Sequence, residues 1–418
     1  MLLRNSFIYV VTNIINSVIP FSLLPIFTRF LSPNDYGIVS LFGILVSVLS
    51  VFVGLNVFGA ISRQFYEKEH VCFPSYIGNS LYILIGSTLV LLLIVFFFND
   101  KISTLFSIPT PLVWVALIMA LSQSLIQILL VIWEAEGYAI RHGAFQIAQT
   151  IINTTLSVFF VVSLKMGWEG RVFAQAFALI LFSCLAFILL LKNDLIRWKI
   201  DISLIRHGLV FGVPLVPHTL GGMAIVISDR LLMNNMYGTN ATGIYAVGAQ
   251  IGILIGILTL SFNQAFVPWL YKELKSITDA KKIRIVRMTY LYSISLIVLS
   301  LLFSFIAPWI LSFFIGKDFQ EAKIYILWIV LGNAFGGMYY MVTNYISYES
   351  KNYLLAMTTF LAAVLNVIFV YFLMKINGPV GAAQGTMLAY LCLFLFTWIL
   401  SQKVYPMPWL NAILLKEK

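Results

Sequence analysis

Two charged residues, Asp229 and Arg230, stand side by side inside the apolar stretch GGMAIVISDRLLMNNMYG of residues 221–238. Charged side chains inside such a segment face a polar cavity or a partner, because burying them in hydrocarbon is costly. A carboxylate there can carry a proton or bind a cation, and a guanidinium can hold a diphosphate through two parallel hydrogen bonds. Two structural explanations also fit: a local Asp229–Arg230 pair, and an Arg230 side chain that reaches the nearby polar end of the segment.

Neutral polar residues recur at intervals that place them on one helix face, because positions three, four, seven or eleven apart stack over each other. The stripes are Gln123, Gln127 and Glu134; Gln146, Gln149 and Asn153; His218, Gly222 and Asp229; and Asn333, Gly337, Tyr340 and Asn344. Such stripes can be hydrogen bonds between packed helices. They can also line a water-filled cavity, where amides bind sugar hydroxyls and aromatic rings face sugar rings. On the second interpretation, the candidate substrate-binding residues include Gln123, Gln127, Asn333, Tyr340 and Asn344.

Three side chains are candidates for coupling to an ion gradient. Asp229 is the acidic residue deepest inside an apolar segment, Glu134 ends a polar stripe, and His218 can change charge near neutral pH. A hydrogen-bonded structural role is the alternative for His218. The three cysteines show neither zinc spacing nor a disulfide framework, and a Gly-rich phosphate loop is absent from the sequence. We therefore expect no metal and no cofactor.

The elements that position these residues are long apolar helices. Hydrophobic residues make up 61% of the 418 residues and charged residues 10%, with a mean hydropathy of +0.97. Soluble domains carry roughly 25% charged residues, so this composition indicates an all-α polytopic membrane protein. Apolar runs predict about twelve transmembrane helices. They cover residues 6–28, 37–60, 75–98, 111–133, 144–164, 171–191, 208–233, 241–266, 286–311, 322–346, 353–374 and 380–402.

A polar stretch near the middle of the chain divides the predicted helices six and six. It predicts an N-terminal six-helix lobe of residues 1–191, a cytoplasmic linker of residues 192–207 and a C-terminal six-helix lobe of residues 208–418. The linker's apolar residues favour a helix lying on the membrane surface, with a solvated loop as the alternative. Most of the 26 Lys and Arg residues fall on the side of the two termini, which predicts that both termini are cytoplasmic. The basic residues form no single face, so nucleic acid is not an expected partner.

The two halves resemble each other in order along the chain. Arg29 and Arg230 lie at the ends of corresponding predicted helices, and Gly167 and Gly170 match Gly378 and Gly381. Parallel internal repeats of this kind are typical of transporter folds. Two arginines at equivalent places predict an anion site between the halves, suited to a diphosphate.

Several segments resemble a known family, the polysaccharide transporters of the multidrug/oligosaccharidyl-lipid/polysaccharide (MOP) superfamily, and Wzx-type O-antigen flippases in particular. The similarity is carried by PIFTRFLSPNDYGIVSLF, ISRQFYEKE, HGLVFGVPLVPHTLGGMAIVISDRLLMNNMYG and TGIYAVGAQI followed by FVPWLYKE. The resemblance implies two six-helix lobes around a central cavity that opens to one side at a time. It implies that an undecaprenyl-diphosphate-linked oligosaccharide is flipped from the cytoplasmic to the periplasmic leaflet of the bacterial inner membrane.

The same resemblance implies substrate-binding roles for Arg29, Arg63, Asp229 and Arg230. The partners that it implies are membrane lipid, a proton or sodium counter-ion, and the polysaccharide polymerase and chain-length proteins of lipopolysaccharide assembly. A MATE-like multidrug or cation antiporter is the alternative, although such a protein is expected to bury more acidic groups. An enzyme, either a polymerase or a glycosyltransferase, needs catalytic residues in a sizeable outer loop. The longest predicted outer loop covers only about residues 99–111, so we expect no enzyme.

Overall fold

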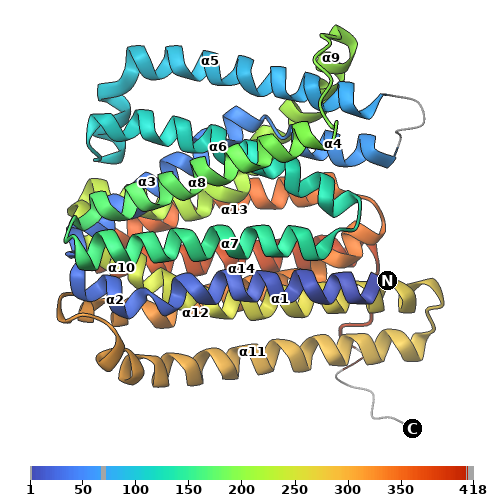
Figure 1. Ribbon diagram of the computed structural model, residues 1–418. Helices are drawn as coiled ribbons and strands as arrows, with labels where there is room; N and C mark the ends of the chain where they lie inside the picture. Colours follow the sequence, from blue (N-terminus) through green and yellow to red (C-terminus); the bar gives the residue numbers. More distant parts are fainter. Residues whose placement is uncertain (1, 67–71, 411, 413–418) are drawn as a thin grey trace. The chain divides into compact units, whose positions relative to one another are not determined.

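The computed structural model describes residues 2–66, 72–410 and 412, and within these ranges every regular element is a helix (Figure 1). The α-helices are α1 (Leu2–Ser22), α2 (Leu24–Phe30), α3 (Pro33–Gly54), α4 (Val57–Tyr66), α5 (Phe73–Phe106), α6 (Thr110–Ala135), α7 (Ala139–Val158), α8 (Gly167–Lys192), α9 (Ile202–Gly212), α10 (Val216–Lys275), α11 (Asp279–Phe314), α12 (Lys323–Tyr348), α13 (Asn352–Asn377) and α14 (Val380–Val404). Three short elements join them: the π-helix η1 (Phe159–Ser163) and the 3-10 helices η2 (Val213–Leu215) and η3 (Lys317–Ala322).

Ten helical runs in the described part are long and apolar enough to cross a membrane. The predicted all-α, multi-pass membrane fold is therefore confirmed, whereas the count of twelve transmembrane helices stays a prediction. The contacts divide the chain into two compact units. Unit 1 comprises Met1–Leu220 and Gly238–Gly243, and unit 2 comprises Gly221–Tyr237 and Ile244–Lys418. The predicted lobes of residues 1–191 and 208–418 also stay a prediction.

In unit 1, α6 is the central helix and packs against α3, α4, α5 and α8. Helix α7 packs against α8 and lies beside α1 (Figure 1). The start of α3 is fixed locally by a capping box, in which the Ser32 side chain accepts from the Asp35 N–H and the Asp35 carboxylate accepts from the Ser32 N–H. Since α6, α7 and α8 pack together, polar stripes on these helices can meet in one place.

The predicted surface helix over residues 192–207 is wrong in its first part. Helix α8 ends at Lys192, residues 195–201 are not helical, and α9 begins at Ile202. The Asn79 side chain of α5 explains the extended backbone, because it donates to the Lys199 carbonyl and accepts from the Asp201 N–H, both at 2.9 Å. These partners replace the bonds that a helix would have made.

Helix α10 consists of two helical arms that meet at Gly238, where the backbone is not helical and the chain reverses direction. The Tyr245 hydroxyl lies 2.6 Å from Asp229 Oδ2, although 16 residues separate the two positions. In a straight helix, 16 residues would span about 24 Å. Gly238 has φ +81°, a conformation that glycine adopts without steric cost. The predicted separate helices at residues 208–233 and 241–266 correspond to the two arms of α10.

The glycines of the predicted repeat share backbone conformations. Gly167 and Gly378 both have positive φ, +60° and +69°. Gly170 and Gly381 both lie against the end of the preceding helical segment, where an added Cβ would approach Phe160 and Leu373 to within 2.9 Å and 2.2 Å. The similarity between the halves therefore extends from residue type to backbone geometry at these positions.

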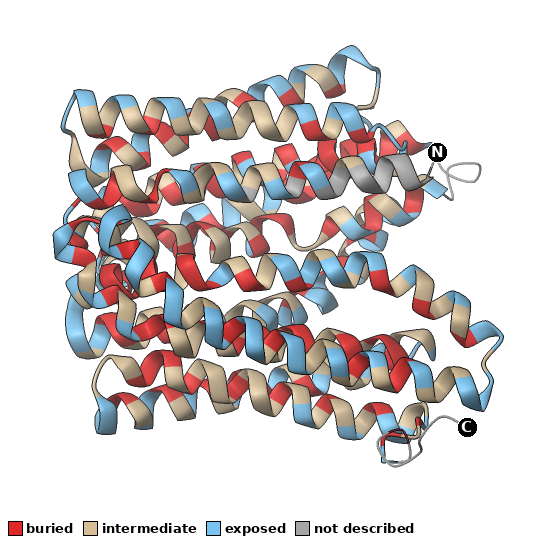
Figure 2. Ribbon diagram, turned by 90° about the horizontal axis from the view of Figure 1, so that it is seen from below, coloured by how far each residue is buried: buried red, intermediate tan, exposed pale blue. Residues whose placement is uncertain are grey.

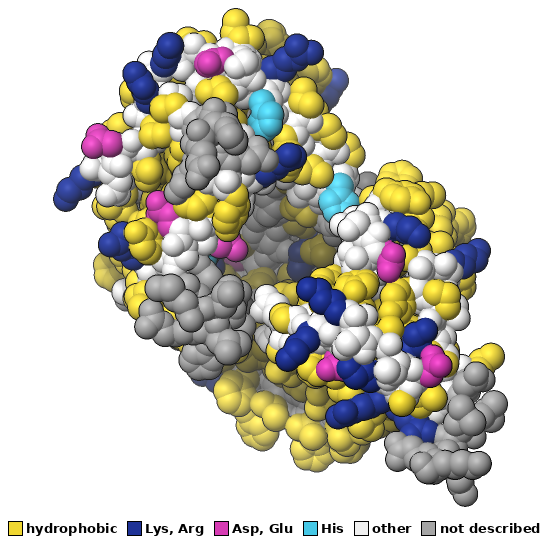
Figure 3. All heavy atoms as spheres, turned by 90° about the vertical axis from the view of Figure 1, so that its right-hand side faces the viewer, with side chains coloured by type: hydrophobic (Ala, Val, Ile, Leu, Met, Phe, Trp, Pro, Cys, Tyr) yellow, Lys and Arg dark blue, Asp and Glu magenta, His cyan; other side chains and the backbone are white. Residues whose placement is uncertain are grey.

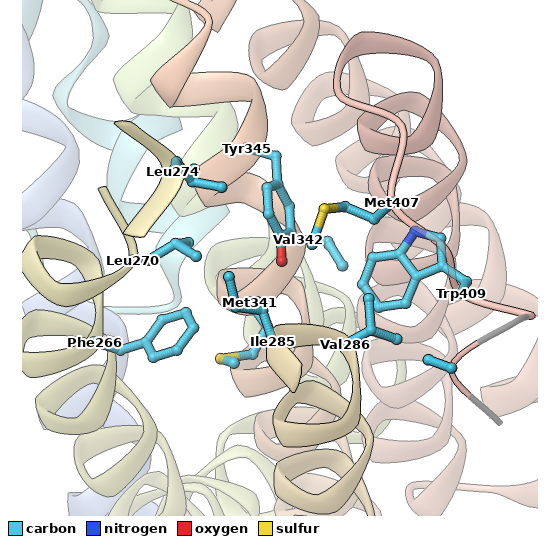
Figure 4. Packing of buried hydrophobic residues seen from close by; sticks show 11 residues of the cluster. Phe266, Leu270, Leu274, Ile285, Val286, Met341, Val342, Tyr345, Met407 and Trp409 are labelled. Atoms are coloured by element: carbon cyan, nitrogen blue, oxygen red, sulfur yellow. The ribbon is translucent and has the colours of Figure 1, made fainter. Parts of the chain in front are cut away.

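In unit 2, α12 packs against α11 and α14, and α13 packs against α14. One core cluster joins three of the helices to the segment after α14 (Figure 4). Its larger members are Phe266, Leu270, Leu274, Ile285, Val286, Met341, Val342, Tyr345, Met407 and Trp409. The segment after α14 is held further by the Tyr290 hydroxyl, which donates to the Trp409 carbonyl at 3.1 Å.

The outward surfaces of single helices are strongly apolar. Individual helices carry both buried and exposed residues (Figure 2), and the exposed ones include Phe97 on α5 and Phe305, Trp309 and Phe313 on α11. Exposed aromatic and aliphatic side chains in such numbers are expected where lipid replaces water. Lys and Arg side chains are frequent on the end face shown in Figure 3, and the cytoplasmic location of the two termini stays a prediction.

Candidate functional site

A polar cavity of about 240 Å³ lies between α6, α7 and α8 of unit 1. Six of its lining residues carry side-chain amides: Gln123, Gln127, Gln146, Gln149, Asn153 and Gln175. The remaining lining residues are Ile126, Leu130, Ala178 and Leu179. We call this the amide cavity. Its lining holds no carboxylate, so its chemistry is that of neutral hydrogen-bond donors and acceptors.

Helical spacing places these amides. Gln123 and Gln127 are one turn apart on α6, and Gln146, Gln149 and Asn153 follow one face of α7. The structure thus brings two predicted stripes to one cavity. Glu134, which was predicted to share the face of Gln123 and Gln127, is exposed and absent from the lining.

Half of the cavity amides make no hydrogen bond to the part of the chain that the structure describes: Gln127, Gln149 and Gln175. Gln123 Oε1 lies 3.2 Å from the Ser50 hydroxyl, and Gln146 Oε1 accepts from Asn16 Nδ2 at 3.4 Å. Amide groups without protein partners inside a membrane bundle are stable only where water or a ligand satisfies them.

Arg171 of α8 lies next to the amide cavity, and the sequence analysis missed it. Its Nη1 donates to Asn153 Oδ1 at 3.0 Å and to the Ser157 hydroxyl, and its guanidinium lies 5.1 Å from the centre of the Phe27 ring. Arg171 is placed one helical turn before Gln175, so the two share a face of α8. This spacing in GWEGRVFAQAFA is the signal that could have identified both residues.

Asp229 forms the centre of a polar network in unit 2. It is only 5% exposed. Its Oδ1 accepts from the Arg230 backbone N–H at 2.7 Å and its Oδ2 accepts from the Tyr245 hydroxyl at 2.6 Å. The Arg230 side chain forms no ion pair with it, and Arg230 Nε is buried without a described hydrogen-bond partner. We call the Asp229–Tyr245 pair, with the Arg230 N–H, the carboxylate clamp.

A second buried network lies close to the clamp in sequence. The Ser228 hydroxyl donates to Asn366 Oδ1 at 2.6 Å, and Asn366 Nδ2 donates to the Thr386 hydroxyl at 3.1 Å. Asn366 is fully buried. The sequence analysis did not single it out because it stands alone in an apolar helix, without a stripe.

The predicted stripe on α12 is largely bonded within unit 2. Asn344 Nδ2 donates to Asn263 Oδ1 at 2.9 Å, and Asn333 Nδ2 donates to the Ile329 carbonyl of its own helix at 2.9 Å. Tyr340 is half-buried, with its ring 5.8 Å from that of Tyr339. Asn344 thus makes the hydrogen bond between packed helices that was the alternative to a cavity wall, whereas Asn333 bonds only to its own helix. Substrate binding by either asparagine stays a prediction.

Three further predicted site residues are exposed: Arg29 on α2, Arg63 on α4 and His218 on α10. Arg29 belongs to unit 1 and Arg230 to unit 2, so a shared anion site for them stays a prediction. Among the described residues, no group of three or more His, Cys, Asp or Glu side chains could hold a metal ion.

Comparisons with known proteins give a consistent result. A family model described as "Polysaccharide biosynthesis protein" matches residues 2–273. An uncharacterized membrane protein of Haemophilus influenzae is 24% identical over 363 residues, which are 84% of this chain and 85% of that protein. The lipid II flippase MurJ, in its inward closed conformation, has a TM-score of 0.75 at 14% identity, covering 98% of this chain and 91% of MurJ.

A multidrug resistance MATE family transporter of the MOP superfamily, in its inward-facing conformation, has a TM-score of 0.68 at 16% identity. That match covers 93% of this chain and 94% of the transporter. At such identities, the two solved structures show a shared fold, and the two six-helix lobes that the sequence resemblance implied stay a prediction.

Proposed function

Because the chain belongs to the polysaccharide biosynthesis protein family, we propose that it is a flippase for a lipid-linked oligosaccharide. The proposed substrate is an undecaprenyl-diphosphate-linked repeat unit of O-antigen or a related surface polysaccharide. The sugar moves from the cytoplasmic to the periplasmic leaflet of the bacterial inner membrane by alternating access, while the lipid tail stays in the bilayer. Fold likeness to a lipid II flippase supports this proposal.

The amide cavity is the observation that carries the proposal. Gln127, Gln149 and Gln175 offer donors and acceptors that no described residue uses. Sugar hydroxyls also donate and accept, so they can pair with such amides. A drug or lipid tail would leave the amides without partners and would lose affinity. Gln123 and Gln127 therefore remain proposed sugar-binding residues, Arg29 and Arg230 remain the proposed diphosphate-binding residues, and Arg63 remains a proposed substrate-binding residue.

A MATE-like multidrug or cation antiporter is the second candidate. The MATE transporter of shared fold supports it, and so does the buried carboxylate of Asp229, which can carry a proton. Ion coupling through Asp229, Glu134 or His218 is compatible with either candidate. The described lining of the amide cavity includes no carboxylate, which favours the flippase because a cation inside a membrane bundle is normally paired with a negative group.

The two candidates are separated by a deletion strain of the source bacterium. We expect loss of surface polysaccharide and accumulation of lipid-linked repeat units on the cytoplasmic side, both restored by the wild-type gene. A triple Gln127→Leu, Gln149→Leu, Gln175→Leu variant should restore export about tenfold less well or worse, since each lost hydrogen bond costs roughly 0.5–1.5 kcal/mol. The matched control is Ile126→Leu, which changes the same wall without removing an amide.

Membrane amounts of each variant are measured by immunoblot, so that loss of the protein is not mistaken for loss of transport. Normal surface polysaccharide in the deletion strain would refute the flippase. Drug resistance on overexpression, without any polysaccharide defect on deletion, would favour the antiporter instead.

A further inference from the structure

The orientation of one cavity amide is fixed by Arg171. A guanidinium carries only donors, so the amide of Asn153 must turn its oxygen toward Arg171 Nη1, 3.0 Å away. The Ser157 hydroxyl lies 3.3 Å from the same oxygen. The Nδ2 group of Asn153 therefore has no described partner, and since Asn153 lines the cavity, we expect this group to face it.

A second chain of hydrogen bonds ends at a cavity amide whose oxygen is likewise occupied. The Thr150 hydroxyl donates to Asn16 Oδ1 at 2.9 Å, which directs Asn16 Nδ2 toward Gln146 Oε1 at 3.4 Å. The oxygen of Gln146 is thereby occupied and its Nε2 group is left for the cavity. Two separate chains of hydrogen bonds, one from Arg171 on α8 and one through Asn16 on α1, therefore each leave the N–H group of an α7 amide without a described partner.

The charge next to the cavity has the matching sign. Arg171 forms no ion pair with any carboxylate that the structure describes. Its Nη1 edge is bonded to Asn153 and Ser157, while Nε and Nη2 make no described hydrogen bond. An anion near Arg171 would be stabilised by this positive charge.

We infer that the amide cavity and Arg171 form a subsite for an anionic oxygen group, either a carboxylate or a phosphate, and that the cavity disfavours cations. The N–H groups of Asn153 and Gln146 bind the oxygens, and Arg171 supplies the compensating charge. This inference rests on the proposed function and narrows its substrate. The group comes either from an acidic sugar of the repeat unit or from the phosphate of the lipid linkage.

The direct test is ligand-dependent thermal unfolding of the purified full-length protein in detergent. Sodium glucuronate, sodium phosphate and glucose are compared with sodium chloride at equal ionic strength, and choline chloride replaces sodium chloride to detect a cation effect. We expect one of the two oxyanions to raise the Tm by mass action, and glucose to raise it less. A response to glucuronate identifies a sugar carboxylate, and a response to phosphate alone identifies the lipid linkage.

Two variants place the response at this subsite. Asn153→Asp keeps the side-chain shape, pairs Arg171 internally and removes the amide donor, and Arg171→Gln removes the charge. Both should abolish the oxyanion response, whereas Lys165→Gln, the same charge change at an exposed position close in the chain, should keep it. If Arg171 has only a structural role, the Arg171→Gln variant will have a lower Tm without ligand but will keep the oxyanion response.

Three results would overturn the inference: no oxyanion response in the wild type, a Tm that depends on sodium rather than on the anion, or a response that survives in both variants. Since the assay needs no transport, it is independent of the export experiment. If the flippase proposal is wrong, the deletion strain will show normal surface polysaccharide. If the subsite is wrong, the oxyanions will leave the Tm of the purified protein unchanged.

Discussion

The two units use polar residues inside apolar helices in opposite ways. In unit 1, the amides of Gln127, Gln149 and Gln175 face a cavity without described partners. In unit 2, both oxygens of Asp229 are occupied by protein donors, and the carboxyl group is almost fully buried. A polar residue in a membrane helix can therefore either be available to a ligand or be hydrogen-bonded within the protein. The neighbouring side chains, and not the residue type, determine which of these two roles it has.

The carboxylate clamp has a clear structural consequence. Asp229 and Tyr245 lie on the two arms of α10 that meet at Gly238. Their hydrogen bond therefore fastens the reversal of the chain. A hydrogen bond to a charged group contributes more than a neutral one. We expect the clamp to contribute mainly to stability and the amide cavity mainly to transport.

The largest effect on stability is expected from Tyr245→Phe. The substitution removes the hydroxyl that donates to Asp229 and leaves a buried carboxylate with one donor fewer. The free energy of unfolding should fall by about 1.5–3 kcal/mol, measured by equilibrium unfolding of the purified protein in mixed detergent micelles.

Tyr237→Phe is the matched control for the clamp. It removes a hydroxyl that donates to the neutral Met374 carbonyl at 2.7 Å, from a side chain that is 37% exposed. Its expected cost is about 0.5–1.5 kcal/mol. Equal losses in the two variants would mean that the charge of Asp229 adds nothing, and the contrast drawn between the units would fail.

The sequence analysis predicted the fold class and the stripes because these depend on composition and on helical spacing. It could not separate the amide cavity from the bonded stripe on α12, because both have the same residue types at the same spacing. Asn344 is occupied by Asn263, a partner 81 residues away, and a contact of that kind depends on tertiary packing. The partner of Asp229 was missed for a similar reason, since Tyr245 meets it only after the reversal at Gly238.

A smaller effect is expected from Asn366→Ala in the second network of unit 2. The substitution removes the acceptor of Ser228 and the donor to Thr386. Ser228 keeps a weaker alternative in the Ile225 carbonyl at 3.4 Å, so the expected loss is about 1–2 kcal/mol. The same unfolding measurement checks it. If Asn366→Ala lowered the free energy of unfolding by more than Tyr245→Phe does, the network around Asn366 would stabilise unit 2 more than the carboxylate clamp does.

The smallest effect on stability is expected from Gln127→Ala in the amide cavity, and it gives the sharpest contrast with the clamp. Gln127 is exposed to the cavity and makes no described hydrogen bond, so its removal breaks no hydrogen bond within the described part of the protein. The free energy of unfolding should change by no more than about 0.5 kcal/mol. Export of surface polysaccharide should nevertheless fall, because a sugar hydroxyl loses its partner.

Tyr245→Phe should then lower stability more than Gln127→Ala does, and the two variants can be compared at equal membrane amounts. If Gln127→Ala instead lowered stability by as much as Tyr245→Phe, the amide would have to be bonded within the folded protein. The amide cavity would then be a packing feature like the network around Asn366, and transport would have to depend on other groups.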